Sequence, residues 1–364
     1  MSKKILVLAN HGLSVHNFRK EMFEELIEAG HEVHISLPYD KNLEYVISLG
    51  CKFIETQVVR RSTNPLTNLK LLLNYRRIVK KVKPDIVLTF TVKPNIYGGL
   101  VCRLLRVPYV ANVTGLGTAV ENGGVMKTFV MTLYKLAFKK ARVVFFQNSH
   151  NMELFLEEKA VRGKTALLPG SGVNLDDFSA LEYPEGDVVN FVFIGRLMRA
   201  KGIEEYFDAA EIIRAELENT RFHICGFAEE DYQERLKDLQ ERGIVQFHGN
   251  VDDMHAFLED MHCIVQPSHH EGMSNTVLEA ASSARPVIAT NIPGCCEAVE
   301  DGVSGLLYTV KDTTDLTEKI RYFMSLGSEQ RYKMGNAARA KMQAEFDRKI
   351  VTQAYLDEIQ AILS

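Results

Sequence analysis

Short apolar runs alternate with helical patterns along this chain, and this alternation is what most restricts its fold. An apolar run over residues 3–10 is followed by the breaker His11-Gly12, by a helical pattern over residues 18–29 and by a stop at Gly30. Further apolar runs follow, with helical stretches between them, at residues 32–37, 85–90, 109–114 and 142–148. Strands that alternate with helices in this way predict a parallel sheet with helices on both faces.

A second series of the same kind begins after a dense cluster of turn residues at 169–172 and an acidic stretch that ends near Asp187. Because 364 residues exceed one comfortable hydrophobic core, we expect two domains. The sequence predicts an α/β fold of two doubly wound, Rossmann-like domains whose parallel sheets face a central cleft. We place these domains at residues 1–170 and 186–345, and we expect a last helix at 346–364 to cross back to the first domain.

Charge is distributed unevenly between the two halves. Residues 1–170 contain 25 Lys and Arg against 13 Asp and Glu, although the whole chain has a formal net charge of −4. Such a split is typical of a half that meets an anionic surface or ligand, but a chance distribution over solvated faces gives the same counts. No nucleic-acid partner is indicated.

The cysteines and the first ten residues favour a cytoplasmic location. The six cysteines lack metal-ligand spacing, and the opening segment MSKKILVLAN lacks the long apolar region of a secretory signal. No apolar run approaches the roughly 20 residues that cross a bilayer. We therefore expect reduced thiols and a cytoplasmic location, with at most peripheral contact with the inner face of the plasma membrane.

Two cations follow the first apolar run of the second series. Arg196 directly follows the run at 189–195, and Lys201-Gly202 stands five residues further on, just before a helical pattern. A guanidinium fork matches phosphate oxygens and an ammonium adds a point charge, so the pair suits a diphosphate leaving group. Two surface cations near a turn would produce the same pattern if the pair stood alone.

Two carboxylates separated by seven residues form a second feature, in the segment EGMSNTVLEA at 271–280. Gly272 lets a ligand approach the backbone, and Ser274 or Asn275 can cap the helix that follows, whose free amides attract phosphate. Glu271 precedes the cap and can accept a hydrogen bond from a sugar hydroxyl. Glu279 lies in the helix and can reach a ribose, although both residues can also be ordinary surface carboxylates.

These residues belong to patterns that resemble those of a known family. The patterns G-R-x4-K-G and E-G-x5-L-E-A, the segment VPYVANVTGLG, the turn PGSGVN and the terminal F-x8-Y helix resemble retaining glycosyltransferase family 4, whose fold is called GT-B. The resemblance covers nearly the whole chain. It implies that Arg196 and Lys201 hold the donor diphosphate. It also implies that Glu271 contacts the donor sugar and Glu279 the ribose, and that further donor contacts come from Val251, beside the base, and from Gly272, Met273, Ser274 and Asn275.

The sequence suggests neither a metal nor a cofactor. No D-x-D sequence occurs in the chain, so a metal-bridged diphosphate is not indicated. Arg196, Lys201 and the helix start would replace the metal. We expect a metal-independent enzyme that uses a nucleotide sugar as its co-substrate.

The first domain contains candidate acceptor residues. Gly12 closes the first apolar run, where its backbone could touch the donor phosphate. Polar and cationic groups follow the predicted strand ends and could line one anionic acceptor pocket, namely His16, Asn17, Arg19, Arg60, Arg61 and Lys93. His16 could act as a base or simply cap the first helix.

Two helical patterns in the first domain, at residues 69–83 and 126–140, mix an apolar stripe with many cations. Such helices can lie in an anionic lipid interface, or the stripe can be core and the cations solvated. The patterns S-x-x-x-F-R, R-R-S-x-N-P and V-T-G-L-G are similar to bacterial members that extend undecaprenyl diphosphate-linked glycans. Many family members have a histidine after the fourth strand that touches the donor sugar, whereas this chain has Asn112, Thr114 and Gly115 in that region.

We therefore expect a retaining transferase that moves a hexose or N-acetylhexosamine from a nucleotide sugar, UDP-linked, to a polyprenyl diphosphate-linked glycan in bacterial surface polysaccharide synthesis. A nucleotide-sugar epimerase on the same double fold is the alternative. A dehydrogenase fits less well, because neither first loop reads G-x-G-x-x-G. A nucleotide-sugar sensor would bind the donor without releasing nucleotide diphosphate.

Overall fold

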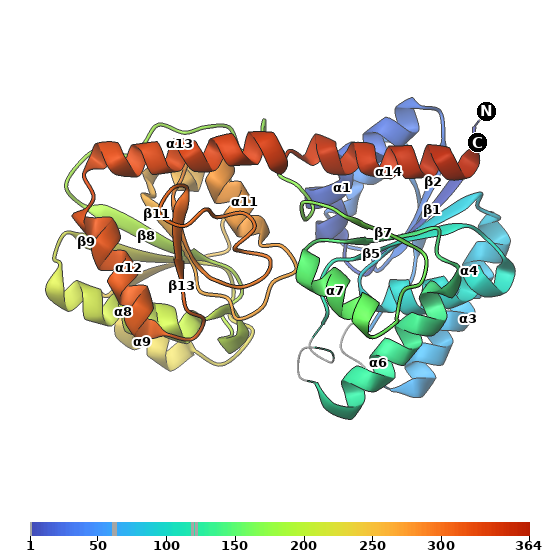
Figure 1. Cartoon of the computed structure of the whole chain (residues 1–364), viewed down its shortest axis with the longest axis horizontal. Coiled ribbons are helices and arrows are strands. Elements are labelled where there is room, and N and C mark those ends of the chain that lie inside the picture. Colours follow the sequence, from blue (N-terminus) through green and yellow to red (C-terminus); the bar gives the residue numbers. More distant parts are fainter. Residues whose placement is uncertain (1, 60–63, 118–119, 121–122) are drawn as a thin grey trace. The chain divides into compact units, whose positions relative to one another are not determined.

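A computed structural model describes residues 2–59, 64–117, 120 and 123–364. The chain divides into two compact units, which Figure 1 shows with their labelled elements. Unit 1 comprises Met1–Ser171 and Lys349–Ser364, and unit 2 comprises Gly172–Arg348.

Unit 1 is built on a seven-stranded sheet in the order β3-β2-β1-β4-β5-β6-β7, in which every pairing is parallel. The predicted apolar runs all form strands. Two strands escaped the sequence prediction, β3 and β7, because both are short, half-buried edge strands that begin with lysine. The strands are β1 (Lys4–Leu8), β2 (Glu32–Leu37), β3 (Lys52–Glu55), β4 (Ile86–Phe90), β5 (Tyr109–Val113), β6 (Val143–Phe146) and β7 (Lys164–Leu167).

Helices cover both faces of this sheet. Alternate residues of β1 point to opposite faces, so Ile5 and Val7 pack under α1, α2 and α14, whereas Leu6 and Leu8 pack under α3 and α4. Farther along that second face, β5 and β6 pack against α6 and α7. The helices are α1 (Gly12–Glu28), α2 (Leu43–Ser48), α3 (Pro65–Val82), α4 (Gly99–Leu105), α6 (Gly124–Ala137), α7 (Ser149–Glu157) and α14 (Arg348–Leu363).

Unit 2 repeats this plan with a six-stranded parallel sheet in the order β10-β9-β8-β11-β12-β13. The strand that the sequence did not predict is β13, a four-residue edge strand. The strands are β8 (Val189–Ile194), β9 (Thr220–Cys225), β10 (Val245–Gly249), β11 (Cys263–Gln266), β12 (Val287–Thr290) and β13 (Gly305–Tyr308).

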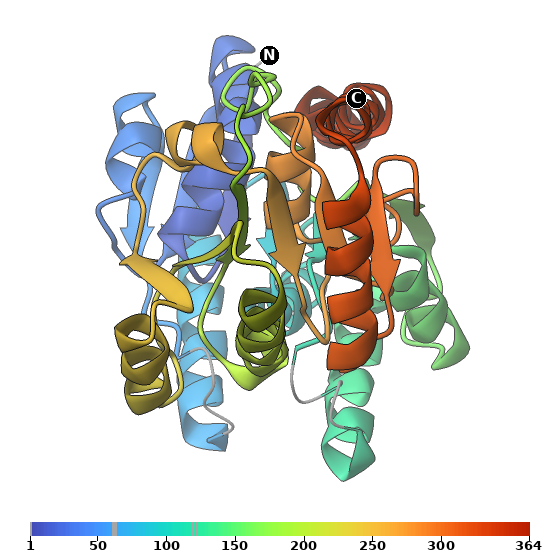
Figure 2. The same cartoon turned by 90° about the vertical axis from the view of Figure 1, so that its left-hand side faces the viewer.

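The helices of unit 2 also form two layers. Those on one face are α8 (Ile203–Glu216), α9 (Gln233–Glu241) and α12 (Thr313–Ser325), which Figure 2 shows on one side of the strands. Those on the other are α10 (Met254–Phe257), α11 (Asn275–Ser282) and α13 (Ser328–Glu345). The prediction of two doubly wound domains with parallel sheets is therefore confirmed.

The first and last helices begin elsewhere than expected. We predicted a loop at His11-Gly12 and a helix from residue 18, but α1 begins at Gly12, directly after an extended His11 with φ −158°. We also expected the last helix to begin at Phe346. Instead, Phe346 is buried among unit 2 side chains, and α14 begins at Arg348.

The chain enters and leaves unit 2 along one short parallel bridge, between Val173 and Asp347. The amide of Val173 donates to Phe346 O at 2.8 Å, and the amide of Arg348 donates to Val173 O at 3.0 Å. Gly172 has φ +66°, and a Cβ at this position would lie 2.6 Å from Arg348 Cα. Only glycine fits between these two passages of the chain.

Candidate functional site

The loops after β8 and β11 meet at the carboxyl edge of the unit 2 sheet. Lys201 ends a 3₁₀ turn that follows β8, and Glu271 follows β11. Lys201 Nζ lies 2.5 Å from Glu271 Oε1, and the same oxygen accepts a hydrogen bond from Gln266 Nε2 at 3.0 Å. Both charged side chains are largely buried, with 22% and 11% of their surface exposed. Lys201 and Glu271, 70 residues apart in sequence, are thus brought into direct contact.

Two glycines allow these loops to pack closely. Gly202 has φ +72°, and a Cβ there would lie 2.0 Å from Pro267 O. Gly294 has φ +89°, and its Cβ would lie 2.9 Å from Glu271 Cβ and 2.9 Å from Gly272 O. A side chain at either position would push the loops apart. The sequence prediction did not include Gln266 or Gly294, because neither belongs to a recognisable motif.

Arg196 lies in the neighbouring loop. It follows β8 and forms an ion pair with Glu229, in the loop after β9. The backbones of these two loops also pair, since the amide of Leu197 donates to Phe227 O at 2.9 Å. Glu229 was not predicted, and its place in the acidic segment AEED offers no signal that would single it out.

Helix α11 begins as the sequence suggested, with Ser274 as its N-cap. Ser274 Oγ accepts from the amide of Val277 at 3.4 Å, and the amide of Ser274 donates to Gly294 O at 2.8 Å. Two of the amides near the helix start are therefore already engaged. Asn275 Oδ1, in contrast, is a buried oxygen without a hydrogen-bond partner among the described residues. A buried amide oxygen of this kind marks a place where a ligand or water can donate.

Glu279 lies inside α11 and is half-buried. Burial raises the pKa of its carboxyl to about 7, and the nearby charge of Arg348 counteracts this rise. The carboxyl therefore changes its charge close to neutral pH, whereas an exposed glutamate would be fully ionised there.

A buried contact between a histidine and a glutamate stands behind the Lys201 loop. His269 Nε2 lies 2.8 Å from Glu205 Oε1, with 8% and 12% of the two side chains exposed. The amide of His269 also donates to Ala200 O at 3.0 Å. These contacts join the start of α8 to the segment before Glu271 and hold both loops in register.

In unit 1, Gly12 and His16 lie in the first two turns of α1. The amide of Gly12 donates to Asp40 Oδ2 at 2.8 Å, and a Cβ would lie 2.4 Å from the Asp40 carboxylate oxygens. His16 is inside the helix, so the idea that it caps the helix is wrong. Its ring contacts the Tyr45 ring edge to face at 5.6 Å, and the neighbouring Asn17 is exposed.

The predicted acceptor cations of unit 1 that the structure describes are held by contacts within that unit. Arg19 is 7% exposed, its guanidinium lies 4.1 Å from the Phe90 ring centroid, and it donates to Ser14 O at 3.1 Å. Lys93 Nζ donates to Val59 O at 2.6 Å and to Asn68 Oδ1 at 2.9 Å, and burial lowers its pKa. Arg60 and Arg61 lie outside the described residues.

Asn112, one of the residues in the region where many family members have a histidine, has a structural partner. Its Nδ2 donates to Tyr355 OH, and its backbone oxygen accepts from Asn95 Nδ2 at 2.7 Å. Tyr355 belongs to α14, so Asn112 helps to fix that helix on the sheet of unit 1.

The described residues contain neither a metal-binding cluster nor a membrane-spanning helix. No three His, Cys, Asp or Glu side chains gather there so as to hold a metal ion. Within the same part of the chain, none of the helices combines the length and apolar character that crossing a bilayer requires.

Two family matches together span most of the chain. Residues 180–341 match the family described as glycosyl transferases group 1, and residues 4–148 match that described as glycosyl transferase 4-like. The first match contains Arg196, Lys201, Glu271 and Glu279.

This chain matches one similar protein over nearly its whole length and another over about two thirds of its length. It is 26% identical, over 97% of both chains, to the N,N'-diacetylbacillosaminyl-diphospho-undecaprenol alpha-1,3-N-acetylgalactosaminyltransferase of Campylobacter jejuni. It is 29% identical, over 69% of both chains, to the UDP-Gal:alpha-D-GlcNAc-diphosphoundecaprenol alpha-1,3-galactosyltransferase of Escherichia coli.

A solved structure agrees with the fold. The Anabaena protein HepE, crystallised with UDP and glucose, superposes with a TM-score of 0.79 at 17% identity, covering 99% of this chain and 100% of HepE. The predicted GT-B fold is therefore confirmed.

Proposed function

This chain belongs to the glycosyltransferases, with a group 1 domain in its second half, and on that premise we propose that it moves a hexose or N-acetylhexosamine from a UDP-sugar to a polyprenyl diphosphate-linked glycan. The observation that carries the proposal is the contact between Lys201 and Glu271. The contact supports the proposal because an ammonium group suits phosphate, a carboxylate suits sugar hydroxyls, and the two lie side by side at the sheet edge where such folds bind ligands.

The charges at this edge suit the chemistry of transfer. The bond between the anomeric carbon and the phosphate oxygen breaks, and negative charge grows on the departing diphosphate. We propose that Lys201 turns from Glu271 toward this charge, and that Arg196 does the same from Glu229. Released from its ion pair, Glu271 then accepts hydrogen bonds from the sugar. Glu279 receives the ribose.

The acceptor hydroxyl attacks the face that the diphosphate leaves, so the anomeric configuration is retained. The same face holds the departing phosphate oxygen, which is within reach to take the hydroxyl proton. In this proposal the two cations and the start of α11 do the work of a metal ion, and the enzyme needs no other cofactor.

The names of similar proteins support the choice of substrates. Both relatives are named for acceptors in which undecaprenol carries a sugar through a diphosphate, and the second is named for a UDP-linked donor. A polyprenyl diphosphate acceptor also explains why the first 170 residues are strongly basic.

A donor assay tests this function. The purified chain is mixed with a panel of UDP-sugars, with and without a synthetic polyprenyl diphosphate glycan, and free UDP is measured. We expect the matching donor to raise the melting temperature and UDP to be released in quantity only with acceptor present. Interconversion of the donor sugar without acceptor would identify an epimerase. Donor binding without any UDP release would identify a sensor, and either result overturns the proposal.

We also propose that unit 1 binds an anionic membrane surface through α3 and α6. One stripe of α3 is buried core, but Leu66, Leu69 and Leu73 are 69%, 52% and 53% exposed. On α6, Val125 and Phe129 are 88% and 58% exposed. Figure 1 shows both helices with α4 on one side of the unit 1 sheet. Exposed cations accompany these apolar residues, namely Lys70, Arg76, Arg77, Lys80, Lys81 and Lys135.

Exposed apolar side chains among cations are what an interfacial helix needs. We expect the chain to float with vesicles that contain phosphatidylglycerol, and the triple variant Leu66→Ser, Leu69→Ser, Leu73→Ser to bind about 10-fold more weakly. A control in unit 2, Tyr322→Ser with Tyr332→Ser, removes two side chains of similar exposure and should bind like the parent. Equal binding of the triple variant and the parent would refute the contact.

A further inference from the structure

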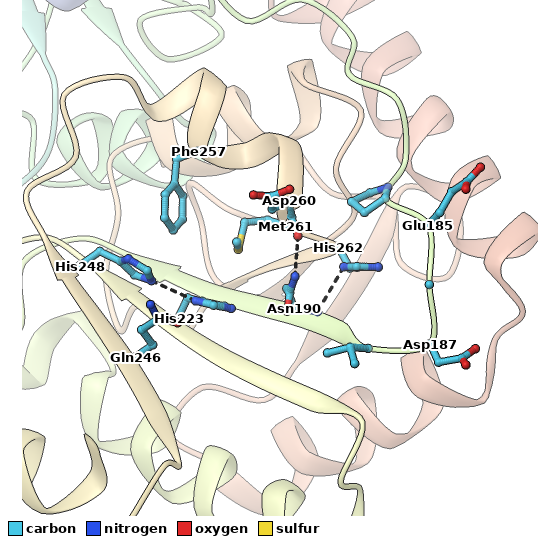
Figure 3. Close-up of a pocket in the computed structure, with 13 residues that line it drawn as sticks. Glu185, Asp187, Asn190, His223, Gln246, His248, Phe257, Asp260, Met261 and His262 are labelled. Carbon is cyan, nitrogen blue, oxygen red and sulfur yellow. Dashed lines mark hydrogen bonds between the residues drawn. The ribbon is translucent and has the colours of Figure 1, made fainter. Parts of the chain in front are cut away.

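A cavity of about 510 Å³ lies in unit 2, and Figure 3 shows the residues that line it. Asn190 is the second residue of β8, and His262 immediately precedes β11. Arg196 and Glu271 follow the carboxyl ends of these same strands, so the cavity lies toward the opposite end of the sheet. Its size falls in the range of small-molecule pockets, about 300 to 1,000 Å³.

Two buried histidines form the floor of this cavity, and each has an unused ring nitrogen. His223 and His262 are 9% and 3% exposed, and the Nε2 atom of each is buried without a hydrogen-bond partner among the described residues. In Figure 3 the His223 ring is directed toward Asn190, and the far edge of the His262 ring is turned toward the segment of Glu185 and Asp187. A buried polar atom without a partner is costly, so two beside one cavity indicate a ligand or ordered water.

The partners of the Nδ1 atoms determine which hydrogen-bonding groups the two histidines present to the cavity. His262 Nδ1 accepts from the amide of Asn190 at 3.2 Å, so its Nε2 carries the proton and is a donor. His223 Nδ1 lies 3.0 Å from His248 Nε2, and the two rings stack at 5.2 Å. Burial lowers the pKa of His223 and of His262 to about 4, so both rings are neutral at physiological pH.

An aromatic ring forms part of the cavity wall, and carboxylates stand at its rim. The Phe257 ring stands edge to face with His248, with centroids 4.9 Å apart. Glu185, Asp187 and Asp260 are exposed carboxylates at the rim, together with the amide of Gln246. Carboxylates at the mouth repel phosphates and other anions, whereas a neutral N–H donor at the floor does not favour a cation.

We propose that this cavity binds one neutral sugar ring of a glycan. Hydroxyl groups both donate and accept hydrogen bonds, so one ring can use the His262 donor, the amides and the rim carboxylates together. The apolar face of the same ring can pack on Phe257. This site goes beyond the proposed transfer, because its residues take no part in the donor chemistry.

Saturation-transfer NMR with the full chain tests the proposal. The probes are the methyl glycosides of glucose, galactose, N-acetylglucosamine and N-acetylgalactosamine, with UDP present in excess to occupy the donor site. At least one glycoside should receive saturation from the protein. Gln246→Trp, which fills the mouth from an exposed position, and His262→Phe, which removes the floor donor, should each reduce the signal at least fivefold. His150→Phe, at an exposed position in unit 1, is the matched control and should leave it unchanged.

Three outcomes would overturn the site. These are no signal from any glycoside, a signal that survives both variants, and displacement of the glycoside by phosphate or by spermidine. Transferase activity, measured in parallel, should be kept in Gln246→Trp. An inactive parent protein would count against the proposed function and would leave the binding result readable.

Discussion

The carboxyl edge of the unit 2 sheet and the corresponding edge of unit 1 hold their cations in different ways. In unit 2, Lys201 and Arg196 each have a carboxylate partner, Glu271 and Glu229. In unit 1, Lys93 donates to a backbone carbonyl and an amide oxygen, and Arg19 lies on an aromatic ring. A carboxylate partner must be displaced before an incoming phosphate can bind. Phosphate binding in unit 2 thus requires Lys201 and Arg196 to exchange partners, whereas Lys93 and Arg19 are oriented by carbonyl oxygens and a ring of unit 1 itself.

The largest test of this comparison is Glu271→Ala. Loss of this carboxylate removes both the partner of Lys201 and the expected sugar contact, so kcat/KM should fall by about 100- to 1,000-fold. Initial rates of UDP release measure the effect, and Glu259→Ala, an exposed carboxylate of the same unit, serves as the control. Full activity in a folded Glu271→Ala protein would falsify the assignment.

Glu279→Gln tests whether a second carboxyl contributes negative charge at this edge. Its folded pKa of about 7 lies above the unfolded value of 4.5, so the native state binds the extra proton between these values. Stability therefore falls as pH rises from about 4.5 to 7, by an amount on the order of 3 kcal/mol. The glutamine amide does not ionise and has no such penalty. In urea unfolding, the free energy of unfolding of the variant minus that of the parent should therefore be larger at pH 8 than at pH 5. A difference that is independent of pH would contradict the raised pKa.

Gly294→Ala tests the backbone that holds Glu271 in place. The new Cβ combines a positive φ with contacts of 2.9 Å, so the Glu271–Gly272 segment should shift, with a loss of roughly 1 to 3 kcal/mol in stability and about 10-fold in kcat. Gly302→Ala is the matched control, because its φ is +76° but nothing lies within 4 Å of the new Cβ. It should share the strain and keep the activity, and equal rates in the two variants would show that the close packing is unimportant.

Glu229→Gln has the smallest expected effect. The neutral amide competes less well than the Glu229 carboxylate with the donor diphosphate for Arg196. Because the Arg196 side chain is 40% exposed, the effect is small, and UDP should bind about threefold more tightly. Calorimetric titration of UDP measures this change. Weaker binding would mean that Glu229 orients Arg196 rather than competes for it.

Much of the fold follows from local sequence. The strand at 143–146 is predicted because its apolar run, VVFF, is continuous, and Ser274 is predicted as a cap because capping needs only the residues beside it. The sequence could not reveal the contacts made by Gln266, Gly294 and Glu229, since each depends on which loops become neighbours. The apolar pattern of α1 did not predict the first six residues of this helix. The start of the helix is held by Asp40, 28 positions away, which accepts a hydrogen bond from the amide of Gly12.

The place of α14 determines the order in which this protein can be completed during synthesis. The core of unit 1 includes Val351, Tyr355 and Ile359, which are synthesised only after the whole of unit 2. Unit 2 ends at Arg348 and has all of its core before then. The second unit is therefore able to mature while the first, although begun earlier, still waits for α14.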